Sequence, residues 1–225
     1  MPKYLFTFQK TETVRWLGHL DILRTFERAI RRAELPIAFS TGFNPRERLT
    51  FASALSTGVT GGAEPAILEL TADVPPEQIV ASLNAALPPA IQIGSCEQVP
   101  DAGSRDLLNA FDRADFEVVC SYPPETDRAA ISRAIDSMMA STVILVTRER
   151  EGRTKCIDIR PLIYQLALDD STPAPDRALL SMRLAVGEGG NARPSDIVTA
   201  IAEIVPGFAL RKAHRVRLAP SGAQN

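Results

Sequence analysis

Residues 15–60 read RWLGHLDILRTFERAIRRAELPIAFSTGFNPRERLTFASALSTGVT, and this stretch decides the fold of the first half of the chain. Placed at roughly 100° per residue, the segment 21–33 gathers its apolar side chains on one arc, which predicts an amphipathic helix with a core face. Pro36 ends this helix, because the residue before a proline avoids the helical conformation. The apolar arc consists of Ile22, Leu23, Phe26, Ala29, Ile30 and Ala33.

The other side of the predicted helix is cationic. Its arginines lie three or four residues apart, and Asp21 and Glu27 interrupt them. Such a stripe is usually a solvated helix face. Here, however, the turn-rich loop 40–48 adds further arginines, and a helix and a loop that both present arginine favour a binding surface. These arginines are Arg24, Arg28, Arg31 and Arg32 on the helix and Arg46 and Arg48 on the loop.

Length and composition are those of an ordinary globular protein. The chain has 225 residues, of which 45% are hydrophobic and 23% charged, enough for one large or two small domains with their own cores. The first residues lack the apolar segment of a signal peptide, and no run approaches the ~20 apolar residues of a membrane span. We therefore expect a cytoplasmic protein that does not enter a membrane.

The net charge of −2 hides a segregation along the chain. Residues 1–60 carry nine Lys and Arg against five Asp and Glu, residues 61–147 carry four against 13, and residues 148–225 carry 12 against nine. The two ends are basic and the middle is acidic. An electropositive surface built from the two ends is therefore plausible, with the acidic segment elsewhere or facing a partner.

The apolar patterns predict the α+β class, as two tandem ferredoxin-like (split βαβ) domains. We expect an N-terminal domain over 1–99, a linker over 100–114 with at most one helical turn, and a C-terminal domain over 115–225. Strands are expected at 4–8, 37–39, 49–55, 66–70, 91–96, 116–122, 143–148, 154–159, 179–186 and 208–218. Helices are expected at 21–33, 76–87, about 127–139 and 194–205.

The opening stretch resembles a known family, the radical-SAM-associated DUF2344 family. The residues that carry the resemblance are 16–21, 26–29, 31–33, 35–36, 40–45 and 49–51, followed by 147–148, 152, 157–161 and 192–194. Asn44 stands where a histidine is expected, which argues against an acid–base role at that position. The resemblance implies a partner, a B12-binding radical SAM protein, and assigns no activity to the family itself.

A second similarity concerns the overall plan. A basic first helix, a Ser-x-Gly-Phe-x-Pro loop at 40–45 and two ferredoxin-like domains are similar to the CRISPR repeat-processing endoribonucleases, whose RNA lies across the domain pair. Similarity at the level of fold carries no function by itself. It does agree with the distribution of charge.

No pattern in the sequence predicts a cofactor in this chain. Cys96, Cys120 and Cys156 are odd in number and far apart, which indicates reduced thiols and excludes the local CxxxCxxC motif of a radical SAM cluster. Only two histidines, His19 and His214, are present, too few with these cysteines for a typical zinc site. Phosphate-binding loops of the GxxxxGK[ST] type are absent from the sequence. We expect neither metal nor cofactor.

His19 is the one weak catalytic candidate. RNA cleavage without a metal needs a general acid and a general base, and His19 near Asp21, Lys10 and Arg15 could provide them. The alternative is a structural role at the start of the helix or the edge of the core. His214 lies in a basic strand in which Arg211, Ala213, Arg215 and Arg217 share a face, and a solvated edge strand is the alternative to a functional role there.

The charged hairpin 148–155 is a second basic segment. It is either an exposed ribbon or a finger that grips phosphate, for which the planar guanidinium group is well suited. Its basic residues are Arg148, Arg150, Arg153 and Lys155. Asp158 and Arg160, just beyond it, are expected to be structural. Among the aromatic residues that could stack on bases, Trp16, Phe39, Phe43 and Phe51, core packing is expected for most, and Phe43 in the loop is the best candidate.

These observations lead to one hypothesis and two competitors. The hypothesis is a non-catalytic module that binds RNA and presents it to a B12-dependent radical SAM enzyme. The first competitor is a protein-interaction subunit of that enzyme without RNA binding, and the second is a metal-independent endoribonuclease using His19. The expected RNA-binding residues are Arg24, Arg28, Arg31, Arg32, Phe43, Arg46, Arg48, Arg148, Arg150, Arg153 and Lys155.

Overall fold

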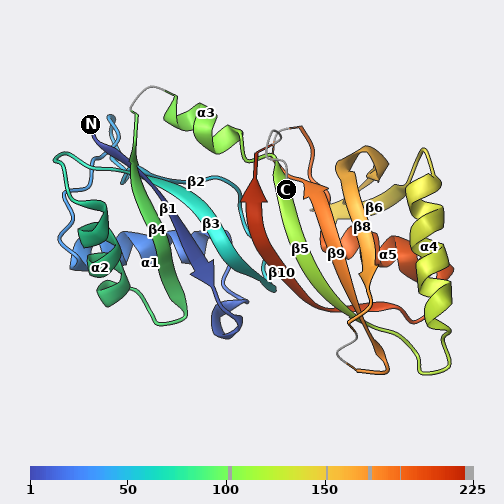
Figure 1. The fold of residues 1–225 in the computed structure, drawn as a ribbon. Helices are drawn as coiled ribbons and strands as arrows, with labels where there is room; N and C mark the ends of the chain where they lie inside the picture. Colours follow the sequence, from blue (N-terminus) through green and yellow to red (C-terminus); the bar gives the residue numbers. More distant parts are fainter. Residues whose placement is uncertain (101–102, 151, 172–173, 188, 221–225) are drawn as a thin grey trace. The chain divides into compact units, whose positions relative to one another are not determined.

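The chain divides into two compact units in the computed structural model (Figure 1). The structure describes residues 1–100, 103–150, 152–171, 174–187 and 189–220. The first unit comprises Met1–Phe111 together with the chain from Arg215 onward, and the second comprises Asp112–His214. Both units combine helices with antiparallel strands, so the predicted α+β class is confirmed.

The first unit is built on strand β1 (Lys3–Lys10), which pairs antiparallel with β3 (Val59–Glu69) on one side and β4 (Ile91–Val99) on the other. The short β2 (Leu49–Phe51) pairs with β3, with Thr50 opposite Ile67. The helices are α1 (His19–Arg32), α2 (Pro76–Ala86) and α3 (Ser104–Asn109), and a 3₁₀ turn, η1, covers Glu12–Val14.

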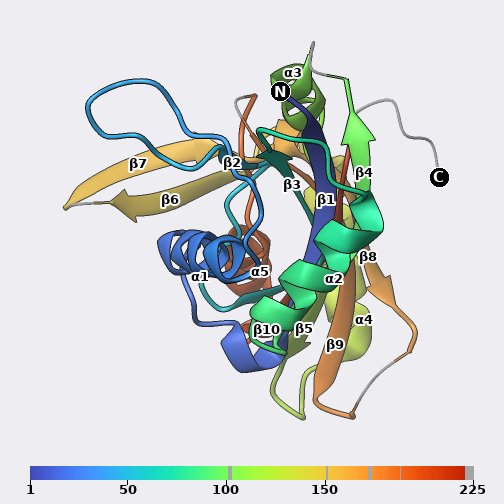
Figure 2. The ribbon, with the colours of Figure 1, turned by 90° about the vertical axis from the view of Figure 1, so that its left-hand side faces the viewer.

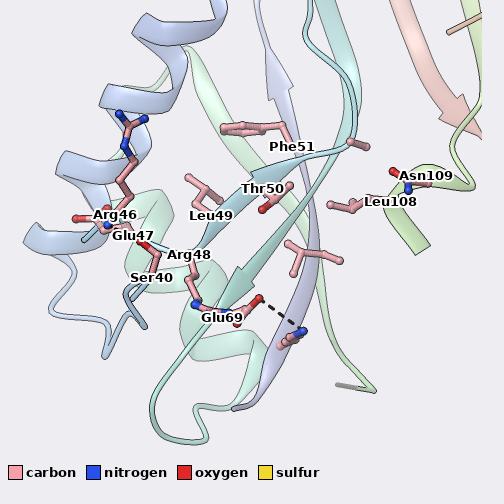
Figure 3. A pocket seen from close by; sticks show the side chains of 13 residues that line it. Ser40, Arg46, Glu47, Arg48, Leu49, Thr50, Phe51, Glu69, Leu108 and Asn109 are labelled. Atoms are coloured by element: carbon pink, nitrogen blue, oxygen red, sulfur yellow. Dashed lines mark hydrogen bonds and ion pairs between the residues drawn. The ribbon is translucent and has the colours of Figure 1, made fainter. Parts of the chain in front are cut away.

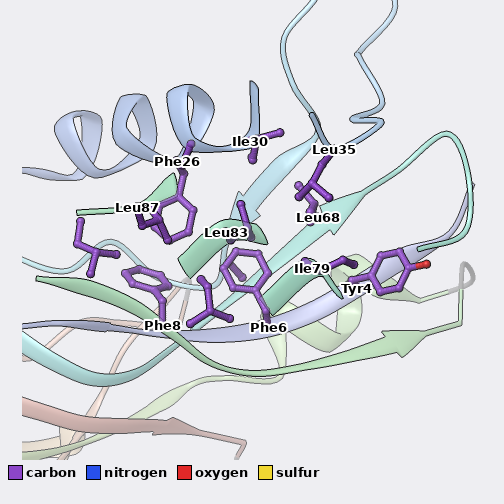
Figure 4. Packing of buried hydrophobic residues seen from close by; sticks show 14 of the residues in the cluster. Tyr4, Phe6, Phe8, Phe26, Ile30, Leu35, Leu68, Ile79, Leu83 and Leu87 are labelled. Atoms are coloured by element: carbon purple, nitrogen blue, oxygen red, sulfur yellow. The ribbon is translucent and has the colours of Figure 1, made fainter. Parts of the chain in front are cut away.

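The core of this unit lies between its strands and the helices α1 and α2 (Figure 4). Tyr4, Phe6 and Phe8 alternate along β1 and are all buried. Phe26 of α1 stands against two of them, with ring centroids 5.7 Å from Phe6 and 5.0 Å from Phe8. The predicted apolar arc of α1 is confirmed, because its members Ile22, Phe26, Ala29 and Ile30 are all buried.

Three charged residues of the first unit are buried over both backbone and side chain: Lys10, Glu64 and Arg215 are exposed by only 1%, 2% and 3%. Arg215 is bidentate on Glu64, with Nε donating to Oε1 over 2.9 Å and the second nitrogen donating to Oε2. Lys10 Nζ donates to the carbonyl oxygens of Arg15 and Leu17 over 2.8 and 2.9 Å. Burial lowers the pKa of Lys10, the Glu64 carboxylate opposes that effect, and Arg215 adds to it.

The second unit has the strand order β5-β9-β8, all antiparallel. The strands are β5 (Arg113–Ser121), β8 (Ile163–Asp169) and β9 (Arg177–Ala185), and a separate hairpin joins β6 (Leu145–Arg150) to β7 (Arg153–Asp158). The helices are α4 (Arg128–Ala140) and α5 (Pro194–Ile204), and a 3₁₀ turn, η2, covers Arg160–Leu162. Strand β10 (Ala209–Ala219) begins in the second unit and ends in the first.

The elements differ from the prediction in several places: the expected strand 49–55 is confined to β2, and the expected strand 66–70 is part of the longer β3. The expected strand 37–39 forms only two isolated bridges, Ile37 to Leu70 and Phe39 to Glu47, because Pro36 and the turn-rich loop leave it too short for a ladder. Strand β8 was not predicted, since its burial does not alternate. The segment expected to be a linker, 100–114, contains α3 and the start of β5.

Asp158 and Arg160 are structural residues, as expected. The Arg160 guanidinium donates to the carbonyl oxygens of Met139 and Ser141 at the end of α4 and to that of Ile163. Asp158 Oδ1 accepts from the backbone N–H groups of Ile144 and Arg160. Together they tie the hairpin to the helix by satisfying carbonyl groups that a helix end leaves unpaired.

We expect Glu64→Gln to lower the free energy of unfolding by about 3–5 kcal/mol, because it leaves the Arg215 guanidinium buried without its counter-charge. Urea unfolding followed by circular dichroism measures this loss. The matched control is Arg133→Gln, which breaks the exposed pair between Arg133 and Asp127, 3.3 Å apart, and should cost less than about 1 kcal/mol. Equal effects of the two changes would contradict the structural importance of the buried pair.

Candidate nucleic-acid interface

The loop between α1 and β2 is attached to α1 by an ion pair. Arg31 Nε donates to Glu47 Oε1 over 2.6 Å, and the Glu47 side chain is only 2% exposed. Arg48 holds the other end of the loop, because it donates to the Phe39 carbonyl oxygen and to Glu69 Oε2 over 3.3 and 3.0 Å. The structure therefore brings together the two arginine-bearing segments that the sequence singles out. Figure 2 shows this loop reaching out from the first unit.

The arginines of this region fall into two groups. Arg31 and Arg48 are engaged by carboxylates, and Arg32 donates to the Ala86 carbonyl oxygen over 2.5 Å. In contrast, the guanidinium groups of Arg24, Arg28 and Arg46 are exposed and have no hydrogen-bond or ion-pair partner among the described residues. A guanidinium group that no carboxylate neutralises is available for phosphate.

Phe43 lies at the tip of the loop and is fully exposed, and Phe39 at its base is 47% exposed. The loop closes below the tip through two hydrogen bonds between Ser40 and Arg46, one from the Ser40 N–H to the Arg46 carbonyl oxygen and one from the Arg46 N–H to Ser40 Oγ. The tip is therefore held at its base while Phe43 remains free to contact a partner.

A cavity of about 570 Å³ opens beside the loop (Figure 3). Leu49, Thr50 and Phe51 line it along β2, and Leu108 and Asn109 of α3 line it from another side. Its charged residues are Lys3, Arg46, Glu47, Arg48 and Glu69, of which Lys3 and Glu69 form an ion pair 3.6 Å long. The cavity thus combines an apolar strand with a polar, mixed-charge rim.

Trp16 is 66% exposed, although the sequence pattern favoured core packing for most aromatic residues. Leu20, at the start of α1, is 61% exposed. The Arg15 guanidinium lies over the indole ring, 4.7 Å from its centroid. Trp16 falls outside the apolar arc of α1, and this position was the signal in the sequence that it is not a core residue.

The hairpin residues are in the second unit and differ in exposure. Arg148 is 18% exposed and donates to Asp196 Oδ2 over 2.5 Å and to the Asn191 carbonyl oxygen over 2.6 Å. Arg153 and Lys155 are exposed. The side chain of Arg150 lies outside the described part of the structure. Arg148 is therefore occupied by its own fold, whereas Arg153 and Lys155 point to solvent.

The two histidines have structural surroundings. His19 begins α1, and its ring stands edge-on to Phe51 with centroids 5.5 Å apart. Asp21, the acid proposed near it, accepts a hydrogen bond from the Gly18 N–H over 3.1 Å. His214 is half-buried, and its neighbours Ala213 and Arg215 are buried. The strand face that carries Ala213 and Arg215, which was expected to be solvated, is therefore buried at these two residues. Within the described ranges, His, Cys, Asp and Glu side chains form no group of three or more that could hold a metal ion.

The family assignment follows from a match over most of the chain. A family model described as an uncharacterized protein conserved in bacteria, DUF2344, matches residues 3–194. The chain belongs to the DUF2344 family. That description names no partner, so the radical SAM association of this DUF2344 chain stays a prediction, as does the similarity to CRISPR endoribonucleases. No curated protein matches the chain.

Solved structures with a similar fold include a Cbf5 complex and H/ACA ribonucleoproteins. A Cbf5–Nop10–Gar1 complex contains a chain with a TM-score of 0.56 and 9% identity, covering 96% of this chain and 48% of that one. An archaeal box H/ACA sRNP Nop10–Cbf5 complex gives a TM-score of 0.53 and 10% identity, covering 96% and 47%. An H/ACA RNP bound to a substrate RNA containing 2′-deoxyuridine gives 0.51 and 9%, again covering 96% and 47%.

The DUF2344 chain thus spans about half the length of these structures, and at such identities the likeness concerns the fold alone. Among the described residues, no helix has the length and apolar character needed to cross a membrane.

We predict that Cys156 is the only cysteine that reacts quickly with iodoacetamide at pH 8. Cys156 is exposed, whereas burial raises the pKa of Cys120 to about 12, and burial together with Glu97 raises that of Cys96 to about 11. Since the thiolate is the nucleophile, about one Cys96 in a thousand is reactive at pH 8, and its rate should rise roughly tenfold per pH unit up to its pKa. Peptide mass spectrometry after timed alkylation measures the order in which the three cysteines react. Rapid labelling of Cys120 in the folded protein would contradict it.

Proposed function

We propose that this protein is a non-catalytic module that binds RNA through α1 and the loop 40–48. The observation that carries the proposal is the set of exposed guanidinium groups of Arg24, Arg28 and Arg46, which have no partner in the described part of the chain. They lie on two segments that the Arg31–Glu47 ion pair joins. Phosphate groups are the partners that such arginines bind best, because the planar fork contacts two oxygens at once.

The remaining expected residues contribute to the proposal in different degrees. Arg31, Arg32 and Arg48 lie on the same two segments and add positive charge, although their guanidinium groups already have protein partners. Phe43 adds an exposed ring at the loop tip. Arg153 and Lys155 offer a second basic segment, with Arg148 and Arg150 beside them in the sequence. The likeness to RNA-associated structures supports the proposal at the level of fold.

We further propose that the first unit is a ferredoxin-like domain. The supporting observation is its strand order, β4-β1-β3 with β2 on the far side of β3, which is produced by a β-α-β-β-α-β sequence of elements. The second unit repeats the pattern of two helices with antiparallel strands and adds the β6–β7 hairpin.

We also propose a cytoplasmic, B12-binding radical SAM protein as the enzyme that the module serves. Only the resemblance of the sequence supports this partner. The competing function, a protein-interaction subunit without RNA binding, draws on the exposed Phe39 and Phe43, because rings on a loop also anchor protein partners. Affinity purification from a cell that contains the radical SAM protein, with and without ribonuclease, separates the two: recovery that survives ribonuclease favours direct protein contact.

We expect Arg24→Gln/Arg28→Gln to weaken RNA binding about tenfold at 50 mM salt and to reduce the slope of log affinity against log salt by about 1.5. Each neutralised phosphate contributes about 0.7 to that slope for a single strand. The measurement is fluorescence anisotropy of labelled, fragmented cellular RNA titrated with nuclease-treated protein across a salt series.

The control is Arg133→Glu, which changes the net charge by the same two units on α4, in the second unit. It should leave the affinity within about twofold if binding depends on the α1 surface and not on total charge. No binding of RNA by the unaltered protein at low salt would refute the proposed function, and an equal loss in both variants would refute its location.

A further inference from the structure

We infer that Trp16 is a stacking platform for an unpaired base of RNA whose backbone lies along α1. The inference rests on the proposed function and specifies it, because it assigns the base-contacting residue and selects single-stranded over duplex RNA. It is carried by three independent features around Trp16: the exposure of its ring, the rigidity of its backbone, and its position at the start of the arginine row.

The exposure of Trp16 is the first feature. It is the only tryptophan of the chain, and two thirds of its surface, 66%, is open to solvent. Tryptophan is highly buried on average in folded proteins, so a largely exposed indole ring is unusual and indicates a binding partner. Aromatic faces bind nucleobases of any sequence, because every base has a π-face.

A buried lysine, Lys10, fixes the backbone on either side of Trp16. Lys10 Nζ donates to the carbonyl oxygens of Arg15 and Leu17, the residues on either side of Trp16, over 2.8 and 2.9 Å. The Gly58 N–H donates to the same Arg15 carbonyl oxygen over 2.8 Å. Lys10 is 1% exposed, so the clamp sits inside the protein while the ring it supports lies outside.

The ring of Trp16 is also held by its neighbours. A Cβ atom at Gly58 would lie 3.2 Å from Cζ3 of the indole, so the ring lies close to the backbone at Gly58 and a larger residue there would push against it. Gly58 has a φ of 85°, which glycine adopts without strain. Arg15 lies over the ring and forms an ion pair with Glu12. An exposed ring held this firmly loses little entropy when a partner stacks on it.

The position of Trp16 completes the argument. Trp16 precedes the helix cap at Gly18 by two residues, and Leu20, Arg24 and Arg28 then follow at four-residue spacing on the exposed side of α1. At 1.5 Å per residue, this row is about 12 Å long. A strand whose phosphates contact Arg28 and Arg24 in turn therefore runs toward the N-terminal end of α1, which the segment carrying Trp16 precedes. Bases of a duplex already stack on each other, so only an unpaired base can use the platform.

The test uses the intrinsic fluorescence of the single tryptophan. A 12-residue oligouridylate added to the full chain should quench Trp16 emission over the same concentration range in which the anisotropy of a labelled copy reports binding. A 12-base-pair RNA duplex should quench it far less. In anisotropy, Trp16→Leu should weaken oligouridylate binding by about 5- to 20-fold, and Trp16→Phe, which keeps a ring, by less than about threefold.

The matched control is Tyr164→Leu in the second unit. Tyr164 is 43% exposed and also carries an arginine over its ring, Arg113 at 4.4 Å, and its replacement should leave the affinity unchanged. Circular dichroism confirms that each variant is folded. RNA binding without quenching, together with equal affinities of Trp16→Leu and the unaltered protein, overturns the inference and leaves the proposed function standing. No anisotropy change with any RNA refutes the proposed function itself, and with it the inference.

Discussion

The buried charges Lys10, Glu64 and Arg215 are the constraint on which the first unit depends. Removing three charged groups from water costs free energy. The fold tolerates this cost because the buried nitrogen and oxygen atoms of these side chains form hydrogen bonds with well-placed partners. Arg215 meets Glu64 and Ser53, and Lys10 meets two backbone carbonyl groups. Such an arrangement favours a single conformation, since a shift of any member leaves a buried polar group without its partner. Because Lys10 also binds the backbone on either side of Trp16, the surface around Trp16 is rigid as well.

Helix α1 connects the interior of the first unit to its candidate interface. One of its sides places Phe26 within a cluster of aromatic rings formed by β1 and β2, and the other side presents Arg24 and Arg28 to solvent. The ion pair between Arg31 and Glu47 then joins the loop to the same helix. Because the core face fixes the rotation of the helix about its axis, it also fixes the direction in which the arginines point. Packing and charge are therefore two consequences of one periodic pattern.

Local patterns predicted much of this, and contacts between distant residues account for the rest. The core face of α1 followed from periodicity, and the arginines of the loop were visible beside its turn residues, because those signals lie within a few positions of each other. The Arg31–Glu47 ion pair that joins the loop to the helix was not predicted. Arg215 was grouped with the solvated arginines of its strand, since nothing near it in the sequence marks Glu64, 151 residues earlier, as its partner. Trp16 was grouped with aromatic residues expected in the core, although its position outside the apolar arc of α1 already indicated that it is exposed. Arg148 resembled a phosphate ligand until its contact with Asp196, 48 residues away, was known.

The distribution of the last strand over both units has a consequence for synthesis on the ribosome. Glu64 is made early, but Arg215, which neutralises it, emerges only after the whole second unit has left the exit tunnel. Until then the nascent first unit holds a carboxylate at a site destined for burial, where Lys10 is the other basic group whose charge interacts with it in the finished core. Closing so long a chain segment is slow compared with forming local contacts. The first unit therefore waits for β10, and the final step of its folding occurs only after the second unit has been made.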